Sequence, residues 1–127
     1  MMEFRVIIAG SRAFTDYNLL KNKCDFYLQR KLLDPNTEVI VISGGASGAD
    51  TLGEKYAKER NLRVERYNAD WKKYGKSAGY RRNKQMAEVG NALIAFRSGY
   101  AENKGTDNMI NVARSEKLLV RVVDEDP

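Results

Sequence analysis

The chain has 127 residues, of which 43% are hydrophobic and 31% charged, and its formal net charge is +5. These values predict a single folded domain over residues 1–127, and no apolar run is long enough to cross a bilayer. One cysteine excludes an internal disulfide. The lack of histidine removes the commonest metal ligand and general base, so we expect neither a metal nor a cofactor.

The positive net charge favours an anionic partner, but it does not distinguish a nucleic acid from a small phosphorylated ligand. The first ten residues, MMEFRVIIAG, lack the basic region and long apolar stretch of a secretion signal. We therefore expect a cytoplasmic protein with no membrane partner.

Five apolar runs predict β-strands, at residues 4–10, 38–44, 62–67, 91–96 and 118–123. The first, second and fourth are almost continuous in apolar residues, which is typical of strands buried on both faces of a parallel sheet. The third and fifth are more mixed, as expected at the edges of a sheet.

Helical patterns fill the segments between these strands. The first runs from about Asp16 to Leu33, with Thr15 or Asp16 as its N-cap and Asp34-Pro35 at its end. In this helix the cysteine is in step with three leucines, which predicts a small buried hydrophobe rather than a reactive thiol (Leu20, Cys24, Leu28 and Leu32). The other helices are expected to begin near Ala49, Ser77 and Thr106.

The alternation of strands and helices predicts an α/β fold with right-handed crossovers. We expect a single Rossmann-like three-layer domain, with a five-stranded parallel sheet of order 3-2-1-4-5 and helices on both faces. Ligands of such sheets bind beyond the carboxyl ends of the strands. The segments that follow the strands are therefore the candidates for a site.

The first two of these segments are rich in glycine and small polar residues. Gly10-Ser11-Arg12 combines a turn with donors for a phosphate, although a solvated turn with a surface arginine is the alternative. Residues 44–50 read GGASGAD, and a glycine turn before a helix can cradle an anion. The alternative is a packing turn with Asp50 as the helix cap. This segment lacks the spacings of a P-loop and of a dinucleotide-binding turn.

The third segment, residues 68–83, concentrates the single tryptophan, two tyrosines and five basic residues. Aromatic side chains beside positive charge suit a nucleobase next to a phosphate, although a charge run is usually a solvated face. The candidate ligand contacts in its first half are Asp70, Trp71 and Tyr74.

Two further residues are expected at the tops of helices. Arg82 shares an apolar stripe with Met86 and Val89, which aims its side chain at the crevice and favours ligand contact over a structural ion pair. Gly105-Thr106 opens the fourth helix, which offers a second helix N-terminus to an anion. A plain threonine cap is the alternative there.

Five stretches together resemble the cpYpsA-related branch of the SLOG superfamily: RVIIAGSRAFTDY, VISGGASGADTLGEKYAKE, NADWKKYGKSAGYRRNKQMAE, ALIAF and GTDNMI. They cover nearly the whole chain in order. The resemblance implies a Rossmann-like domain that binds a nucleotide or a nucleotide-derived ligand, such as a signalling nucleotide. The superfamily includes lysine-decarboxylase-like phosphoribohydrolases, the DNA-processing protein DprA and sensor domains of prokaryotic defence systems. Related proteins often pair, so the resemblance also implies a homo-oligomer.

The resemblance implies a ligand site made by residues of all four segments: Gly10, Ser11, Arg12, Gly44, Gly45, Ala46, Ser47, Gly48, Asp50, Arg82, Asn83, Gly105 and Thr106. Two positions depart from the related sequences. Asn68 stands where the branch usually has proline. Met109 stands at the glutamate position of the phosphoribohydrolase signature P-G-G-x-G-T-x-x-E, which argues against cleavage of an N-glycosidic bond by that mechanism.

The leading prediction is a binding module for a nucleotide or nucleotide-derived ligand. Backbone amides of the glycine turn and of the helix at Thr106 would hold phosphate, with charge added by Arg82 and Arg12. Asp50 is suited to accept a hydrogen bond from a ribose hydroxyl, and an aromatic side chain of the third segment, Trp71 or Tyr74, would cover the base.

Two alternatives remain open at this stage. The first is a nucleotide hydrolase of the N-glycosidase (phosphoribohydrolase) type with Asp50 and Arg82 as catalytic residues; such chemistry needs a carboxylate, and the others available are Glu54, Asp70 and Asp107. The second is single-stranded nucleic-acid binding, which the positive charge and the DprA kinship favour and the mixture of acidic with basic residues disfavours.

Overall fold

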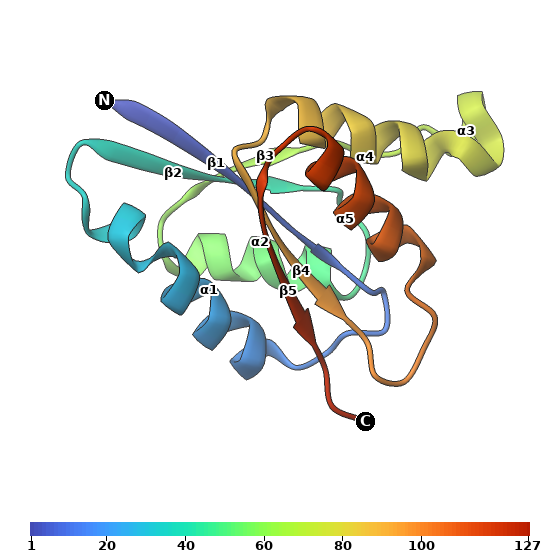
Figure 1. The fold of residues 1–127 in the computed structure, drawn as a ribbon, viewed down its shortest axis with the longest axis horizontal. Helices are drawn as coiled ribbons and strands as arrows, with labels where there is room; N and C mark the ends of the chain where they lie inside the picture. Colours follow the sequence, from blue (N-terminus) through green and yellow to red (C-terminus); the bar gives the residue numbers. More distant parts are fainter.

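The computed structural model describes all residues from Met1 to Pro127 and shows alternating strands and helices (Figure 1). In chain order the elements are β1 (Met2–Gly10), α1 (Tyr17–Leu33), β2 (Thr37–Ser43), α2 (Ala49–Glu59), β3 (Arg63–Arg66), α3 (Trp71–Tyr74), the 3-10 helix η1 (Gly75–Ser77), α4 (Ala78–Val89), β4 (Ala92–Arg97), α5 (Lys104–Ser115) and β5 (Leu119–Asp124).

The five strands form one sheet of order β3-β2-β1-β4-β5, and every neighbouring pair is parallel. The predicted α/β fold, strand order and edge strands are therefore confirmed. Strands β1, β2 and β4 are almost fully buried in their centres, whereas β3 and β5 consist of exposed and half-buried residues apart from the buried Val123. Burial on both faces explains why the three central strands read as continuous apolar runs.

The side chains of β1 divide the core into two layers. Val6 and Ile8 pack with residues of α1 and α2 on one face of the sheet. Ile7 and Ala9 pack with residues of α4 and α5 on the other face. Figure 1 shows these two pairs of helices on opposite sides of the sheet, which is the predicted three-layer arrangement.

Helix α1 has the predicted bounds. Its N-cap is Asp16, whose carboxylate accepts a hydrogen bond from the backbone N–H of Leu19 (3.0 Å), and it ends one residue before Asp34-Pro35. Cys24 is fully buried, and this burial raises the pKa of its thiol above the usual range. The cysteine is therefore an inert core residue, as its spacing predicted.

Three details of the helices differ from the prediction. The segment before α4 forms two short helical turns, α3 and η1, which were not predicted, although α4 itself begins at Ala78, next to the expected Ser77. Val89 is 42% exposed instead of buried, because Ala87 takes the inward position and a residue two places further on lies about 200° around the helix. Helix α5 begins at Lys104, two residues before Thr106. None of the helices combines the length and apolarity that a membrane span requires.

Candidate functional site

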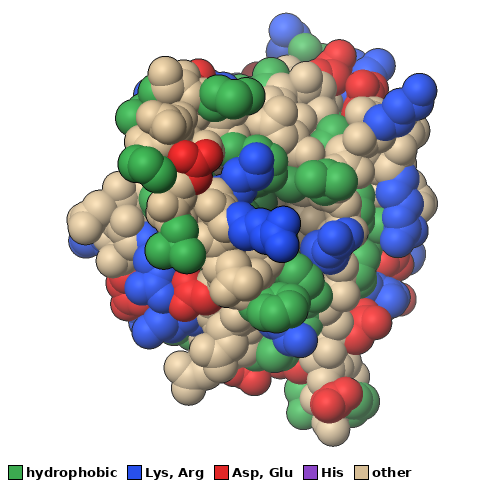
Figure 2. Space-filling model, turned by 60° about the vertical axis from the view of Figure 1, so that its left-hand side comes forward, with side chains coloured by type: hydrophobic (Ala, Val, Ile, Leu, Met, Phe, Trp, Pro, Cys, Tyr) green, Lys and Arg blue, Asp and Glu red, His purple; other side chains and the backbone are tan.

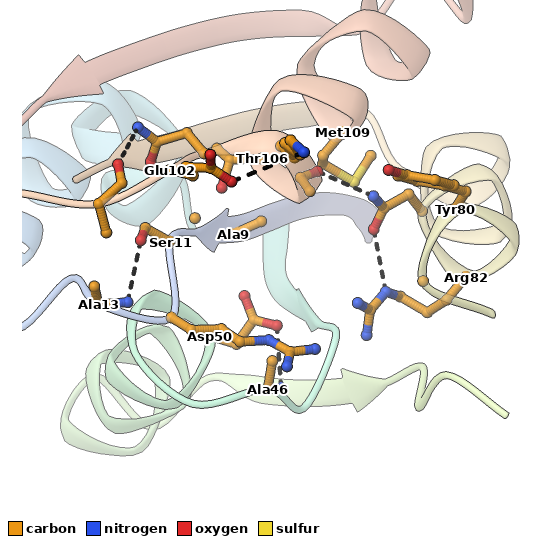
Figure 3. Close-up of a pocket in the computed structure, with 18 of the residues that line it drawn as sticks. Ala9, Ser11, Ala13, Ala46, Asp50, Tyr80, Arg82, Glu102, Thr106 and Met109 are labelled. Atoms are coloured by element: carbon orange, nitrogen blue, oxygen red, sulfur yellow. Dashed lines mark hydrogen bonds and ion pairs between the residues drawn. The ribbon is translucent and has the colours of Figure 1, made fainter. Parts of the chain in front are cut away.

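A cavity of about 410 Å³ opens at the carboxyl end of the sheet. Its floor is the end of β1, and its walls come from α2, α4, the start of α5 and the loop before α5. Figure 3 shows Asp50 and Arg82 below the end of β1 and Thr106 and Glu102 above it. The predicted residues that line this cavity are Gly10, Ser11, Arg12, Ala46, Asp50, Trp71, Arg82, Asn83, Gly105 and Thr106.

A second cavity of about 340 Å³ lies beside the first. It holds three more of the predicted residues, Gly44, Gly45 and Ser47. The remaining three, Gly48, Asp70 and Tyr74, line neither cavity. The structure therefore brings together most, but not all, of the residues that the sequence singled out.

The glycines of the turn between β2 and α2 are accounted for by contacts within the protein. Gly48 has φ +74°, and a Cβ there would lie 2.3 Å from the carbonyl oxygen of Ser11. A Cβ at Gly44 would lie 2.6 Å from Nη1 of Arg82 and 2.8 Å from Oδ2 of Asp50. Glycine at these positions thus lets the turn pack on the β1–α1 loop and lets Arg82 reach the backbone.

Asp50 is a buried carboxyl group that faces the cavity. The residue is 5% exposed, and its Oδ2 accepts a hydrogen bond from the backbone N–H of Ala46 (3.1 Å). Burial raises the pKa of Asp50 to about 6, against the opposing effects of the Ala46 hydrogen bond and of the nearby Arg82. Asp50 does not cap α2, whose N-cap is Gly48. Its other oxygen, Oδ1, makes no hydrogen bond within the protein and is available to a ligand.

Arg82 is held in place by the backbone rather than by an ion pair. Its Nη1 donates to the carbonyl oxygen of Gly44 (2.6 Å), and its Nε donates to Oδ1 of Asn83 (3.1 Å). Burial lowers the pKa of Arg82, and the nearby Asp50 opposes that shift. None of the ion pairs within the protein involves Arg82. The residue lines the cavity, and its contact with a ligand stays a prediction.

Asn83 joins the two helices that flank the cavity. Its side chain is buried and donates to the carbonyl oxygen of Gly105 (3.2 Å) and to Oδ1 of Asn108 (2.9 Å), while it accepts from Arg82. Because these bonds use both ends of the amide, Asn83 positions Arg82 and the start of α5 rather than presenting a free group to a ligand.

The start of α5 is uncapped. The side chain of its N-cap, Asn103, turns away to bond with the backbone N–H (2.8 Å) and the carbonyl oxygen (3.0 Å) of Ser98. The first backbone N–H of α5 with a partner is that of Asp107. Thr106 is 5% exposed, lines the cavity, and its hydroxyl has no partner within the protein. A free first turn beside a free hydroxyl is suited to bind an anion.

The other carboxylates named from the sequence are engaged elsewhere. Glu54 pairs with Arg66, Asp70 accepts from the backbone N–H of Lys73, and Asp107 pairs with Arg97. Glu102, which the sequence did not single out, does line the cavity, although its side chain is 82% exposed. Of the carboxylates considered, Asp50 is therefore the one that is both buried and directed at the cavity.

The aromatic residues of the third segment have different positions. Trp71 lines both cavities, is 49% exposed, and has the guanidinium of Arg12 5.8 Å from its ring centroid. Tyr74 instead lies outside the cavity, where the guanidinium of Arg81 is 4.4 Å from the centroid of its ring. Tyr80 lines the cavity and was missed, although it lies on α4 two residues before Arg82.

The comparisons with known proteins agree with this architecture. Residues 4–74 match the model of the YspA, cpYpsA-related SLOG family. The "Gene 61 protein" of Mycobacterium phage D29 is 33% identical over 122 residues, which are 91% of this chain and 93% of the phage protein. The chain belongs to the YspA, cpYpsA-related SLOG family.

A solved structure has a similar fold. DNA processing protein A (DprA) from Streptococcus pneumoniae superposes with a TM-score of 0.65 at 16% sequence identity. The likeness covers 95% of this chain and 50% of the DprA chain, so this chain spans half the length of that protein. At this identity the likeness concerns the fold.

Proposed function

We propose that the protein binds a nucleotide or a nucleotide-derived ligand in the cavity at the carboxyl end of the sheet. The observation that carries this proposal is the combination of groups around one space. The uncapped start of α5 and the free hydroxyl of Thr106 lie with Arg82, while the buried carboxyl of Asp50 faces the same cavity. A nucleotide combines an anionic phosphate with a ribose whose hydroxyls donate hydrogen bonds. The start of α5, Thr106 and Arg82 suit the phosphate, and Asp50 suits the ribose.

The arrangement supports a role for each group. Backbone N–H groups at Gly105 and Thr106 hold the phosphate, because the helix dipole and the free donors point into the cavity. Arg82 and Arg12 add positive charge, and Asp50 accepts a hydrogen bond from a ribose hydroxyl. The indole of Trp71 stacks on the base at the mouth of the cavity.

Calorimetry with a panel of mono-, di- and cyclic nucleotides tests the proposal. Arg12→Gln removes an exposed arginine that has no ion pair, so we expect an unchanged fold and an affinity weaker by roughly tenfold to a hundredfold. Lys72→Gln is a matched control, because Lys72 is also exposed but lines neither cavity. No binding of any nucleotide at high micromolar concentration would contradict the proposal.

A second candidate function is hydrolysis of the N-glycosidic bond of the bound nucleotide. The observation in its favour is the buried Asp50, whose pKa of about 6 suits proton transfer near neutral pH. In this reaction water adds across the bond between ribose C1′ and the base, and the departing base takes up a proton. Release of free base that is lost in both Asp50→Asn and Arg82→Ala would establish the activity, whereas binding without release would exclude it.

Single-stranded nucleic-acid binding is a third candidate, supported by the name of the DNA processing protein that shares the fold. On the face drawn in Figure 2, lysine and arginine side chains gather across the middle, and acidic side chains lie mainly around them. Titration of a fluorescent oligonucleotide at rising salt separates the candidates, because phosphate-backbone binding weakens steeply with salt. An affinity for the oligonucleotide that does not fall with salt would exclude single-stranded nucleic-acid binding.

A further inference from the structure

The two cavities adjoin each other, and we treat them as two lobes of one cleft. The first lobe is the cavity of about 410 Å³ at the end of β1, and the second lobe is the adjoining cavity of about 340 Å³. They share four lining residues, Arg12, Ala46, Trp71 and Arg82. A ligand that fills the first lobe therefore lies against the two arginines that also line the second lobe.

The second lobe is lined by polar groups that have no partner in the protein. In the β2–α2 turn, backbone groups of Gly44, Gly45, Ala46 and Gly48 make hydrogen bonds within the protein. The hydroxyl of Ser47 and the amide of Asn68, which both line this lobe, make none. The lining also contains no carboxylate, whereas the first lobe has Asp50 and Glu102. These features favour an anionic group over a cation.

The junction between the lobes carries positive charge that the protein does not neutralise. Arg12 makes no ion pair, and its guanidinium is close enough to Arg82 to contribute to lowering the pKa of that residue after the effect of burial. Asp50 is the carboxylate that offsets this charge, and burial raises its own pKa to about 6. Two guanidinium groups against one weakly acidic carboxyl leave a net attraction for an anion on both sides of the junction.

We propose that the second lobe binds a second anionic group, so that the ligand is a nucleotide with phosphoryl groups on two sides of its ribose. This inference rests on the proposed function. One phosphoryl group lies at the start of α5, and the ribose lies at Asp50. The other phosphoryl group accepts hydrogen bonds from Arg12, Ser47 and Asn68.

Calorimetry with three probes tests the inference: adenosine 5′-monophosphate, adenosine 5′-diphosphate and adenosine 3′,5′-bisphosphate. The bisphosphate should bind at least about tenfold more tightly than the monophosphate, because it gains charge-assisted hydrogen bonds in the second lobe. It should also bind more tightly than the diphosphate, which carries both phosphates on one side of the ribose.

The double variant Ser47→Ala/Asn68→Ala localises the effect. Both residues are exposed, so the fold should be retained, as circular dichroism would check. We expect the variant to lose the advantage of the bisphosphate and to bind the monophosphate like the wild type. A bisphosphate that gains nothing, or a gain that survives in the double variant, overturns the two-lobed ligand and leaves the proposed function standing. Absence of binding by all three probes overturns both.

Discussion

At the scale of single residues, Asp50 links the site to stability. Its pKa is raised by burial to about 6 from an ordinary value of 3.8, so the folded state holds its proton between pH 4 and 6 while the unfolded state releases it. Ionised Asp50 therefore lowers the free energy of unfolding as pH rises through this window, by at most about 3 kcal/mol at 1.36 kcal/mol per pKa unit.

Asp50→Asn removes this penalty and keeps an oxygen for the N–H of Ala46. We expect the variant to be more stable than the wild type above pH 6, by about 1 to 3 kcal/mol, and equal to it near pH 4. Urea unfolding at several pH values measures the difference in free energy of unfolding between the variant and the wild type. The contributions of the other titrating groups cancel in this difference. A difference that is the same at pH 4 and pH 8 would show that Asp50 is not held in this environment.

Gly48 offers a second prediction at the same scale. Alanine there must keep φ +74° and bring its Cβ to the carbonyl oxygen of Ser11, so the β1–α1 loop has to move. Gly75 is a matched control, because it also has positive φ (+58°) but open space around it. We expect Gly75→Ala to cost about 1 to 3 kcal/mol for the backbone alone, and Gly48→Ala to cost clearly more. Equal losses in urea unfolding would contradict the packing role of Gly48.

At the scale of elements, Asn83 couples α4 to α5. Asn83→Ala leaves Nε of Arg82, the carbonyl oxygen of Gly105 and Oδ1 of Asn108 without their partner. We expect a loss of about 2 to 4 kcal/mol, because three partly buried hydrogen bonds are lost and each contributes about 0.5 to 1.5 kcal/mol. Asn108→Ala breaks one of the three bonds and serves as the control. If the two variants lose the same stability, the amide of Asn83 is not the link between the helices.

The sequence predicted the elements well but their ends at the site less well. Arg82 was placed correctly because the stripe of α4 distinguishes it from Arg81, which instead lies over Tyr74. Glu102 was not predicted, and the free start of α5 was predicted at Thr106 only beside the alternative of a threonine cap. From the sequence, the side chain of Asn103 could have capped the helix. It bonds with the backbone of Ser98 instead, and this depends on the conformation of the six-residue connection between β4 and α5, which has no sequence periodicity.

At the scale of the whole molecule, the central and edge positions of the strands were predictable, because a strand buried on both faces has a more continuous apolar sequence than an edge strand. The three central strands are apolar in their buried centres, and the two edge strands are mixed. The division of the cleft into two lobes was not predictable in this way. The second lobe lies where the β2–α2 turn, the β3–α3 loop and α4 meet. These segments are far apart in the sequence, so the sequence does not predict the cavity between them.

This convergence gives a prediction for the whole domain. A ligand in the cleft would contact residues from both faces of the sheet, including Asp50 of α2 and Arg82 of α4, so its binding should oppose unfolding of the entire chain. At a concentration 100 times the dissociation constant it adds about 2.7 kcal/mol to the free energy of unfolding, which raises the Tm of a domain of this size by roughly 10 °C. Thermal unfolding followed by circular dichroism, with the tightest nucleotide of the calorimetric panel, measures the shift. Arg12→Gln at the same ligand concentration should show a smaller Tm shift, because its larger dissociation constant lowers the ratio of ligand concentration to dissociation constant. A nucleotide that binds by calorimetry yet leaves the Tm unchanged would contradict binding to the folded domain alone.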